Sequence, residues 1–272
     1  MSLVTHVART LGLLLGFLVS AVLVGAFGYL VVSFLAMRGH TPARPWRDAL
    51  RAMFAEAMAV ALTQPLIPLF YLVGHRMSGR RSGVPIILVH GYFQNRADFV
   101  YLAWAFRRAS LGPLYGFNYN WTRGVPTCAA KLAAFVERVC TETGQPKVAI
   151  VAHSLGGVVA VEYLATPAGA ARVDRCITVA SPHAGVVWRA GMIGASARQL
   201  SATSEYMKSS AVRPLPIRVV SLFSTHDNIV HPSTTSALTL RGGDDETVDG
   251  VGHLSMLFSR KVVDVLVRRL SG

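Results

Sequence analysis

The first feature of the hydrophobic pattern is a long N-terminal stretch without charged residues. Residues 10–37 contain no Asp, Glu, Lys or Arg over 28 positions. As a helix this stretch would rise about 42 Å, more than the ~30 Å hydrocarbon core of a bilayer. A cleaved signal peptide is the alternative, but its apolar region is normally about 7–15 residues long and ends at a small-residue cleavage site. The pattern therefore favours an uncleaved N-terminal transmembrane helix, with residues 1–38 as the membrane anchor.

The next segment, residues 39–82, is basic at its start and hydrophobic further on. Residues 57–74 carry no charge, but Gln64, Pro65 and Pro68 interrupt helical hydrogen bonding, and the stretch is shorter than the usual span of about 20 residues. An interfacial or domain-packed segment is therefore favoured over a second crossing.

The charges that flank the first stretch bear on its orientation. Arg9 and the amino terminus precede it, and four arginines offset by Asp48 follow it: Arg38, Arg44, Arg47 and Arg51. With a single span, this excess places the bulk of the chain in the cytoplasm. A second crossing would place it on the opposite side. The expectation is a single-pass membrane protein, with the side on which the bulk of the chain lies left open.

From residue 83 the pattern changes to alternating strand and helix signals. Continuous apolar runs typical of buried parallel strands occur at residues 85–90, 114–119, 147–152, 173–180 and 217–223. Helical spacing lies between most of them, most clearly over 127–143, which Gly144 ends. This alternation predicts an α/β domain over residues 83–272, a mostly parallel sheet with helices on both faces. Reactive groups of such sheets gather at the carboxyl ends of the strands.

Composition narrows the expected partners. The 272 residues include 27 Lys and Arg against 14 Asp and Glu, a formal net charge of +13, so an anionic partner is expected. The basic residues are mostly Arg among apolar stretches, without an RNA-binding module or a DNA-reading motif. Anionic headgroups of a membrane fit better than nucleic acid. Cys128, Cys140 and Cys176 lack metal-ligand spacing and are expected to be buried thiols.

Ser154 lies where a predicted strand turns into a predicted helix. The strand ends at Ala152, and the apolar helical run 158–165 follows shortly after. A sharp turn here needs small residues two before and two after the serine, and Ala152 and Gly156 satisfy this. The pattern predicts a nucleophile elbow, with the Leu155 N–H donating to an oxyanion. A serine that only caps a helix is the weaker alternative.

A serine nucleophile needs a base, and the base needs an orienting acid. With this type of elbow they follow in the chain order Ser, Asp or Glu, His. Asp227 comes directly after the strand at 217–223, and His253 lies in a loop before a terminal helix over 254–270. We predict Asp227 as the acid and His253 as the base. A turn-forming aspartate and a helix-capping histidine are the alternatives. Three other histidines compete weakly for the role of base: His153, His226 and His231.

The loop after the first strand is expected to complete the oxyanion hole. Gly91 lets the chain turn so that the Tyr92 N–H faces the nucleophile, whereas His90 is expected to hold the loop. Residues 186–213 fall where a small cap would lie, although they could equally fill the core. Substrate-binding residues are predicted at Phe93, His153, His183, Val186 and Trp188.

Five motifs together resemble bacterial triacylglycerol lipases and related esterases of the α/β-hydrolase superfamily. They are His90-Gly-Tyr92, Ala152-His-Ser-Leu-Gly-Gly157, Ser181-Pro-His-Ala-Gly185, Asp227-Asn-Ile-Val230 and Gly252-His-Leu-Ser255. The resemblance covers roughly residues 83–271. It implies an α/β-hydrolase fold, a Ser154, Asp227 and His253 triad, and oxyanion donors at Tyr92 and Leu155.

Many secreted relatives carry a calcium site, which cannot be assigned in this sequence. Asp244, Asp245 and Asp249 are expected to form a solvated acidic loop. No metal and no cofactor is therefore expected.

The pattern, composition and resemblance together predict a membrane-anchored serine hydrolase of the bacterial inner membrane. It would cleave carboxylic esters with a medium or long acyl chain, from membrane or lipid-like substrates, through an acyl-enzyme on Ser154. Two alternatives stay open: an acyltransferase that uses the same triad, and a catalytically silent membrane scaffold.

Overall fold

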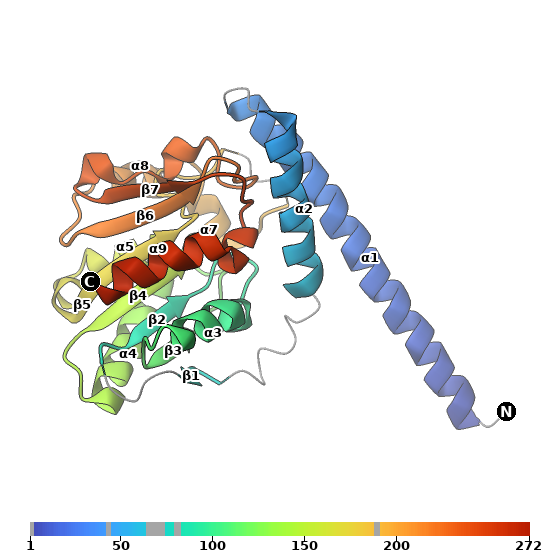
Figure 1. Cartoon of the computed structure of the whole chain (residues 1–272), viewed down its shortest axis with the longest axis horizontal. Coiled ribbons are helices and arrows are strands. Elements are labelled where there is room, and N and C mark those ends of the chain that lie inside the picture. The colour runs from blue at the N-terminus through green and yellow to red at the C-terminus, as the bar shows by residue number, and fades with distance from the viewer. Residues whose placement is uncertain (1–2, 42–44, 64–73, 79–82, 188–190) are drawn as a thin grey trace.

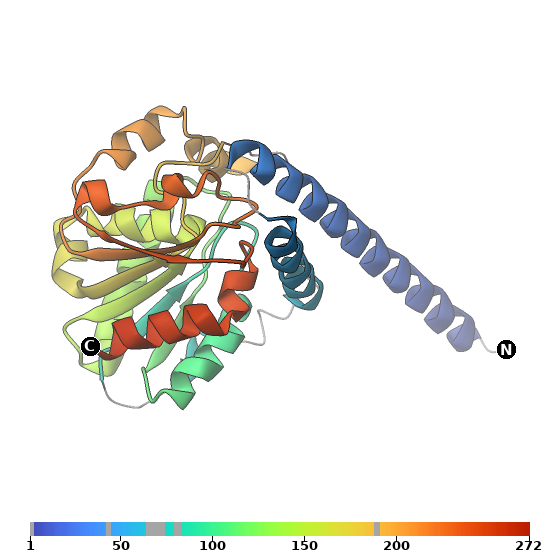
Figure 2. The same cartoon turned by 45° about the horizontal axis from the view of Figure 1, so that its top comes forward.

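The computed structural model describes residues 3–41, 45–63, 74–78, 83–187 and 191–272. Two N-terminal helices, α1 (Leu3–His40) and α2 (Trp46–Thr63), precede an α/β domain. The C-terminal half of α1 and helix α2 lie side by side against the α/β domain, and the N-terminal half of α1 projects away from both (Figure 1, Figure 2).

The α/β domain is built on one seven-stranded sheet in the order β1-β3-β2-β4-β5-β6-β7. Every neighbouring pair is parallel except β1 with β3. The strands are β1 (Arg76–Ser78), β2 (Ile86–Val89), β3 (Leu114–Phe117), β4 (Val148–His153), β5 (Val173–Val179), β6 (Val219–Ser224) and β7 (Asp244–Val248). The mostly parallel sheet predicted from the apolar runs is confirmed, and each of the five runs coincides with one of the strands β2 to β6, of which β4 and β6 end one residue later than predicted.

Helices cover both faces of the sheet because alternate residues of each strand point to opposite sides (Figure 2). Ile87 and Val89 belong to the core beneath α4 (Val125–Thr143) and α5 (Leu155–Leu164). Their neighbours Ile86 and Leu88 face α3 (Val100–Arg108) and α9 (Arg260–Ser271). The described residues also form α6 (Pro167–Arg172), α7 (Gly194–Gln199), α8 (Glu205–Ala211) and the 3-10 helices η2 (Arg96–Phe99), η3 (Ser233–Ser236), η4 (Thr239–Arg241) and η5 (Ser255–Phe258).

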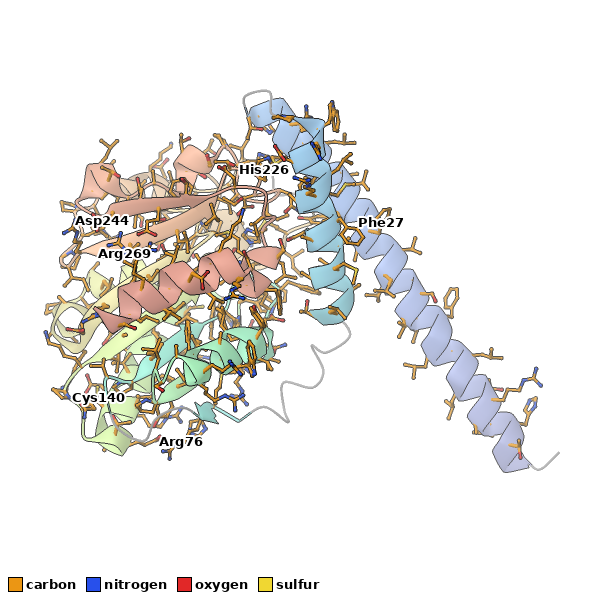
Figure 3. All side chains as sticks on the ribbon, viewed as in Figure 1. Phe27, Arg76, Cys140, His226, Asp244 and Arg269 are labelled. Carbon is orange, nitrogen blue, oxygen red and sulfur yellow. The ribbon has the colours of Figure 1, made fainter. Side chains whose placement is uncertain are left out.

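The two edge strands, β1 and β7, were not predicted. Strand β7 contains two of the aspartates expected in a solvated acidic loop, and that expectation is wrong. Asp244 forms ion pairs with Arg218 at 2.6 Å and with Arg269 at 3.8 Å (Figure 3). Asp245 Oδ1 accepts the Leu238 N–H at 2.7 Å. Charged residues on an edge strand do not produce the continuous apolar run that marks a buried parallel strand.

Helix α1 is long and apolar enough to cross a membrane. Its Thr5–His40 part has a mean hydropathy of 2.3 over the most apolar window, and none of that window is buried against the rest of the protein. Residues 57–63 of the predicted interfacial segment complete α2, where Ala59 and Thr63 are buried. Residues 64–73, including Gln64 and both prolines, lie outside the described residues. The three cysteines are free and buried, as predicted.

Candidate active site

Ser154 occupies the sharp turn between β4 and α5. Its backbone has φ 53° and ψ −125°, a conformation that costs an L residue about 1–3 kcal/mol and that the surrounding structure must hold in place. The Ser154 N–H donates to the Val179 carbonyl at 2.8 Å. A Cβ added to Gly156 would lie 2.5 Å from the His90 carbonyl oxygen, so only glycine fits two residues after the serine. The chain therefore makes the turn that the predicted elbow requires.

Three residues from distant parts of the chain meet at this turn. With its proton on Nδ1, His253 accepts a hydrogen bond from Ser154 Oγ through Nε2 at 2.9 Å. Its Nδ1–H faces Asp227 Oδ2 at 2.8 Å and Oδ1 at 3.1 Å. Asp227 Oδ1 also accepts the N–H groups of Ile229 at 2.8 Å and Val230 at 2.7 Å. The structure thus brings the predicted nucleophile, base and acid into one hydrogen-bonded series.

Two carboxylates control the charge of His253. Burial of the ring lowers its pKa, but the negative charge and hydrogen bond of Asp227, together with the charge of Glu56, outweigh this effect. The pKa of His253 therefore lies above its ordinary value of 6.5. Protonated His253 cannot accept the Ser154 proton, so the free protein is competent as a base only above this raised pKa.

Glu56 of α2, which no sequence motif marks, supports the loop that carries His253. Its side chain is 3% exposed. Its two carboxylate oxygens accept the N–H of Leu254 at 2.8 Å and the N–H of Ser255 at 2.7 Å. Burial raises the pKa of Glu56, while these two donors and the nearby His253 lower it, with a net rise. The spacing of small residues could have pointed to Glu56. It is the one acidic residue on the buried face of α2, which also contains Ala49, Ala52, Ala59 and Thr63.

Helix α1 also contacts these loops, through a hydrogen bond with Asn228. The Asn228 amide donates through Nδ2 to Ser33 Oγ at 2.8 Å, and its Oδ1 accepts the His253 N–H at 3.1 Å. Because Asn228 follows Asp227 directly, one amide joins the acid loop, the base loop and the N-terminal helix.

We predict that Glu56→Gln lowers kcat/KM for ester hydrolysis by about 10²-fold, since one amide cannot accept both N–H groups and the displaced histidine loses its alignment. The pH profile distinguishes an effect on His253 from a general loss of folded protein. The low-pH midpoint of kcat/KM should lie above 6.5 in the wild type, because the pKa of His253 is raised. It should move down in Glu56→Gln, because one of the charges that raise this pKa is removed.

Asp48→Asn on the same helix is the matched control, because among the described residues the Asp48 carboxylate forms an ion pair with exposed Arg51 at 3.7 Å. It should leave the rate and the midpoint unchanged. An unshifted midpoint in Glu56→Gln, with full activity, would contradict the assigned role.

The loop after β2 packs directly against Ser154. The Gly91 N–H donates to Gln94 Oε1 at 2.7 Å. A Cβ at Gly91 would approach Ser154 Cβ to 2.8 Å, so glycine is required for this close contact. Tyr92 follows, and Leu155 is the first residue of α5. Their N–H groups as oxyanion donors remain a prediction.

His90 ties this loop to the neighbouring strand end. Its ring donates from Nδ1 to the Gly91 carbonyl at 2.9 Å and accepts the Tyr119 N–H at 3.3 Å. Burial lowers the pKa of His90 to about 4, so the ring is neutral and holds the loop, in keeping with its expected structural role.

A cavity of about 520 Å³ opens beside Ser154, within the range of about 300–1,000 Å³ that small-molecule sites occupy. Among the residues predicted to bind substrate, Phe93 and Val186 line it. Trp188 lies outside the described residues. Met192 and Ile193 from the predicted cap also line the cavity. The Tyr92 hydroxyl accepts the Ile193 N–H at 2.6 Å and so ties the cap to the loop after β2.

Two predicted substrate-binding histidines lie elsewhere, and those assignments are corrected. His153 is buried behind the base, with Nδ1 2.8 Å from Gln94 Oε1 and Nε2 3.1 Å from the His253 carbonyl oxygen. His183 lies 2.9 Å from Thr178 Oγ1 through Nε2. Neither lines the cavity. The His153 ring is held by Gln94 and the loop of His253, and the His183 ring is held by Thr178 of β5.

The other competing histidines also have structural surroundings. His226 Nδ1 accepts the Gly250 N–H at 3.1 Å, and the His231 ring stacks on His40 of α1 at 5.0 Å.

A parallel sheet with helices on both faces and a serine turn at the end of a central strand is the arrangement of the α/β-hydrolase fold. A family model described as the alpha/beta hydrolase fold matches residues 84–216. The chain therefore has the α/β-hydrolase fold.

Solved lipases and esterases share this fold. The mature lipase BlEst2 of Bacillus licheniformis matches with 18% identity and a TM-score of 0.61, over 71% of this chain and 94% of that one. Lipase B of Aspergillus fumigatus matches with 18% identity and a TM-score of 0.63, over 71% of this chain and 54% of that one. Carboxylesterase CesB of Bacillus subtilis matches with 18% identity and a TM-score of 0.50, over 83% of this chain and 98% of that one.

Proposed function

We propose that this protein is a membrane-anchored serine esterase that cleaves carboxylic esters with a medium or long acyl chain through an acyl-enzyme on Ser154. The hydrogen-bonded series from Ser154 Oγ through His253 to Asp227, open to a largely apolar cavity, carries this proposal. The lipases and esterases of the same fold support the ester substrate.

In the proposed mechanism His253 Nε2 takes the Ser154 proton as Oγ attacks the ester carbonyl. The N–H groups of Tyr92 and Leu155 stabilise the oxyanion that forms. Protonated His253 then gives its proton to the leaving alcohol, and the acyl group stays on Ser154. Asp227 holds the ring with Nδ1 protonated and stabilises the imidazolium. Water, activated by His253 in the same way, releases the carboxylic acid and regenerates the serine.

Helix α1 supports the membrane part of the proposal. It carries no charge over residues 10–37, and none of its most apolar window is buried. The net charge of +13 suits anionic headgroups, which attract basic residues near a membrane surface. Anchoring by α1 would keep the cavity close to lipid esters.

The experiment that tests the proposal combines turnover with mapping of the nucleophile. Full-length protein in detergent micelles should hydrolyse p-nitrophenyl butyrate, and a fluorophosphonate probe should modify one tryptic peptide, at Ser154. Heat-denatured protein is the control and should stay unlabelled, because only the assembled site activates the hydroxyl.

An adduct on another serine would overturn the nucleophile assignment, and absence of both labelling and turnover would point to a silent scaffold. Product analysis with a competing alcohol then shows whether water or the alcohol takes the acyl group.

A further inference from the structure

One wall of the cavity beside Ser154 comes from the candidate membrane helix. Residues at helical spacing on α1 line it: Val22, Gly25, Ala26, Tyr29 and Leu30. Ser154 and His253 line the same cavity from the α/β domain. Helix α1 is therefore part of the cavity in which the proposed reaction takes place, in addition to being a candidate anchor.

The wall is held in position by contacts on the following turns of α1. Leu30, Phe34 and Met37 are each 4% exposed or less and pack against Ala52 of α2. The Ser33 hydroxyl accepts a hydrogen bond from Asn228, whose Oδ1 in turn accepts the His253 N–H. The apolar wall and the catalytic loops thus share one set of contacts.

The N-terminal part of α1 precedes this wall. Residues 5–21 are all exposed, and Phe27, further along the helix, is 56% exposed (Figure 3). A helix needs about 20 residues to cross the ~30 Å hydrocarbon core. A span of this length that begins at Thr10, the first residue of the charge-free stretch, ends at Tyr29. The wall is therefore formed by the last turns of the part that fits a bilayer, at the depth where acyl chains meet their ester groups.

Helix α2 adds a second apolar surface beside α1. Five exposed residues repeat every four positions along it: Trp46, Leu50, Phe54, Met58 and Leu62. Each is between 45% and 69% exposed. An apolar stripe of this length on a helix next to a candidate membrane span is suited to contact with lipid.

We propose that α1 forms the acyl-binding wall of the active site and that the substrate is an ester-bearing lipid of the bilayer. Its acyl chain would lie against Val22 to Leu30 and its ester carbonyl would reach Ser154. Gly25 and Ala26 would leave room for the chain, because larger side chains on this face of α1 would fill the cavity. This inference rests on the proposed esterase function and adds the class of substrate and the wall that selects it.

The test compares two glycines of α1. A Cβ added at either Gly25 or Gly28 would meet no heavy atom of the described residues within 4 Å, so a side chain can begin at both positions without a shift of the backbone. Gly25 lines the cavity, whereas Gly28 is absent from the described residues that line it. Gly25→Leu should lower kcat/KM for p-nitrophenyl palmitate by about tenfold or more relative to its effect on p-nitrophenyl acetate. Gly28→Leu should match the wild type on both esters.

The lipid source is tested with full-length protein in phosphatidylcholine vesicles that contain diacylglycerol. The wild type and Gly28→Leu should release fatty acid, and Gly25→Leu should release it about tenfold more slowly. Equal behaviour of the two variants on all esters would overturn the inference, as would a wild type that cleaves the acetate ester but no vesicle lipid. A wild type inactive on every ester would instead reject the proposed function.

Discussion

Replacing Ser154 with alanine is expected to lower kcat for ester hydrolysis by about 10⁶-fold, the size of loss seen when a nucleophile that acts as one unit with its base is removed. The variant lacks the oxygen that forms the acyl-enzyme, whereas the cavity and the oxyanion donors stay in place. Residual activity would come from these alone.

The fold should survive this change. Alanine keeps the Cβ and the backbone, and the Ser154 N–H still donates to the Val179 carbonyl. Among the described residues, the serine Oγ donates a hydrogen bond to His253 at 2.9 Å. The thermal midpoint of Ser154→Ala should therefore stay close to that of the wild type. A well-folded variant that keeps more than about 1% of the wild-type rate would place the nucleophile elsewhere, because the expected loss is far larger.

Replacing Asp227 with asparagine is expected to lower kcat by about 10⁴-fold, because the histidine is then held in the wrong tautomer. The asparagine carbonyl oxygen would still accept hydrogen bonds from the Ile229 and Val230 N–H groups, which donate to Asp227 Oδ1 in the wild type. Its NH₂ group would then face His253 Nδ1, which must become an acceptor. The ring proton moves to Nε2 and points at Ser154, so His253 cannot take the serine proton.

The same change removes the charge that most raises the pKa of His253, so the low-pH midpoint of the residual activity should move down. Asp245→Asn is the matched control. Its carboxylate accepts the Leu238 and Thr239 N–H groups beside β7 and takes no part in the triad contacts. Activity of this control should be unchanged. A loss below about tenfold in Asp227→Asn would be incompatible with the role of Asp227 as the orienting acid.

The N-terminal helices contact the loops beside Ser154, so their role extends beyond attachment of the α/β domain to a membrane. Helix α2 supplies Glu56 to the base loop, and α1 bonds through Ser33 to Asn228. The catalytic loops are thus supported by the segment that is proposed to meet the membrane. Removal of both helices would leave the Leu254 and Ser255 N–H groups without their carboxylate, at a cost of about 1–3 kcal/mol for each group left buried and unsatisfied.

Those parts of the protein that depend on near neighbours in the chain were predictable. The buried strands were visible as apolar runs, and the turn at Ser154 required small residues at fixed positions on either side. Asp227 and His253 were found because each follows a recognisable element in a fixed chain order. The edge strands β1 and β7 were missed because half-exposed pairing leaves no continuous apolar run.

The sequence by itself determined the alternation of strands and helices, the elbow at Ser154, the order of acid and base, and a charge-free helix long enough to span a bilayer. Only the tertiary structure decided which side chains surround that serine. Glu56 meets Leu254 across 198 positions of the chain, and Ser33 meets Asn228 across 195. The local sequence pattern shows which face of a helix is apolar. Which other element packs against that face depends on the tertiary structure. For this reason the structure moved His153 and His183 out of the predicted binding site and placed one face of α1 in the cavity.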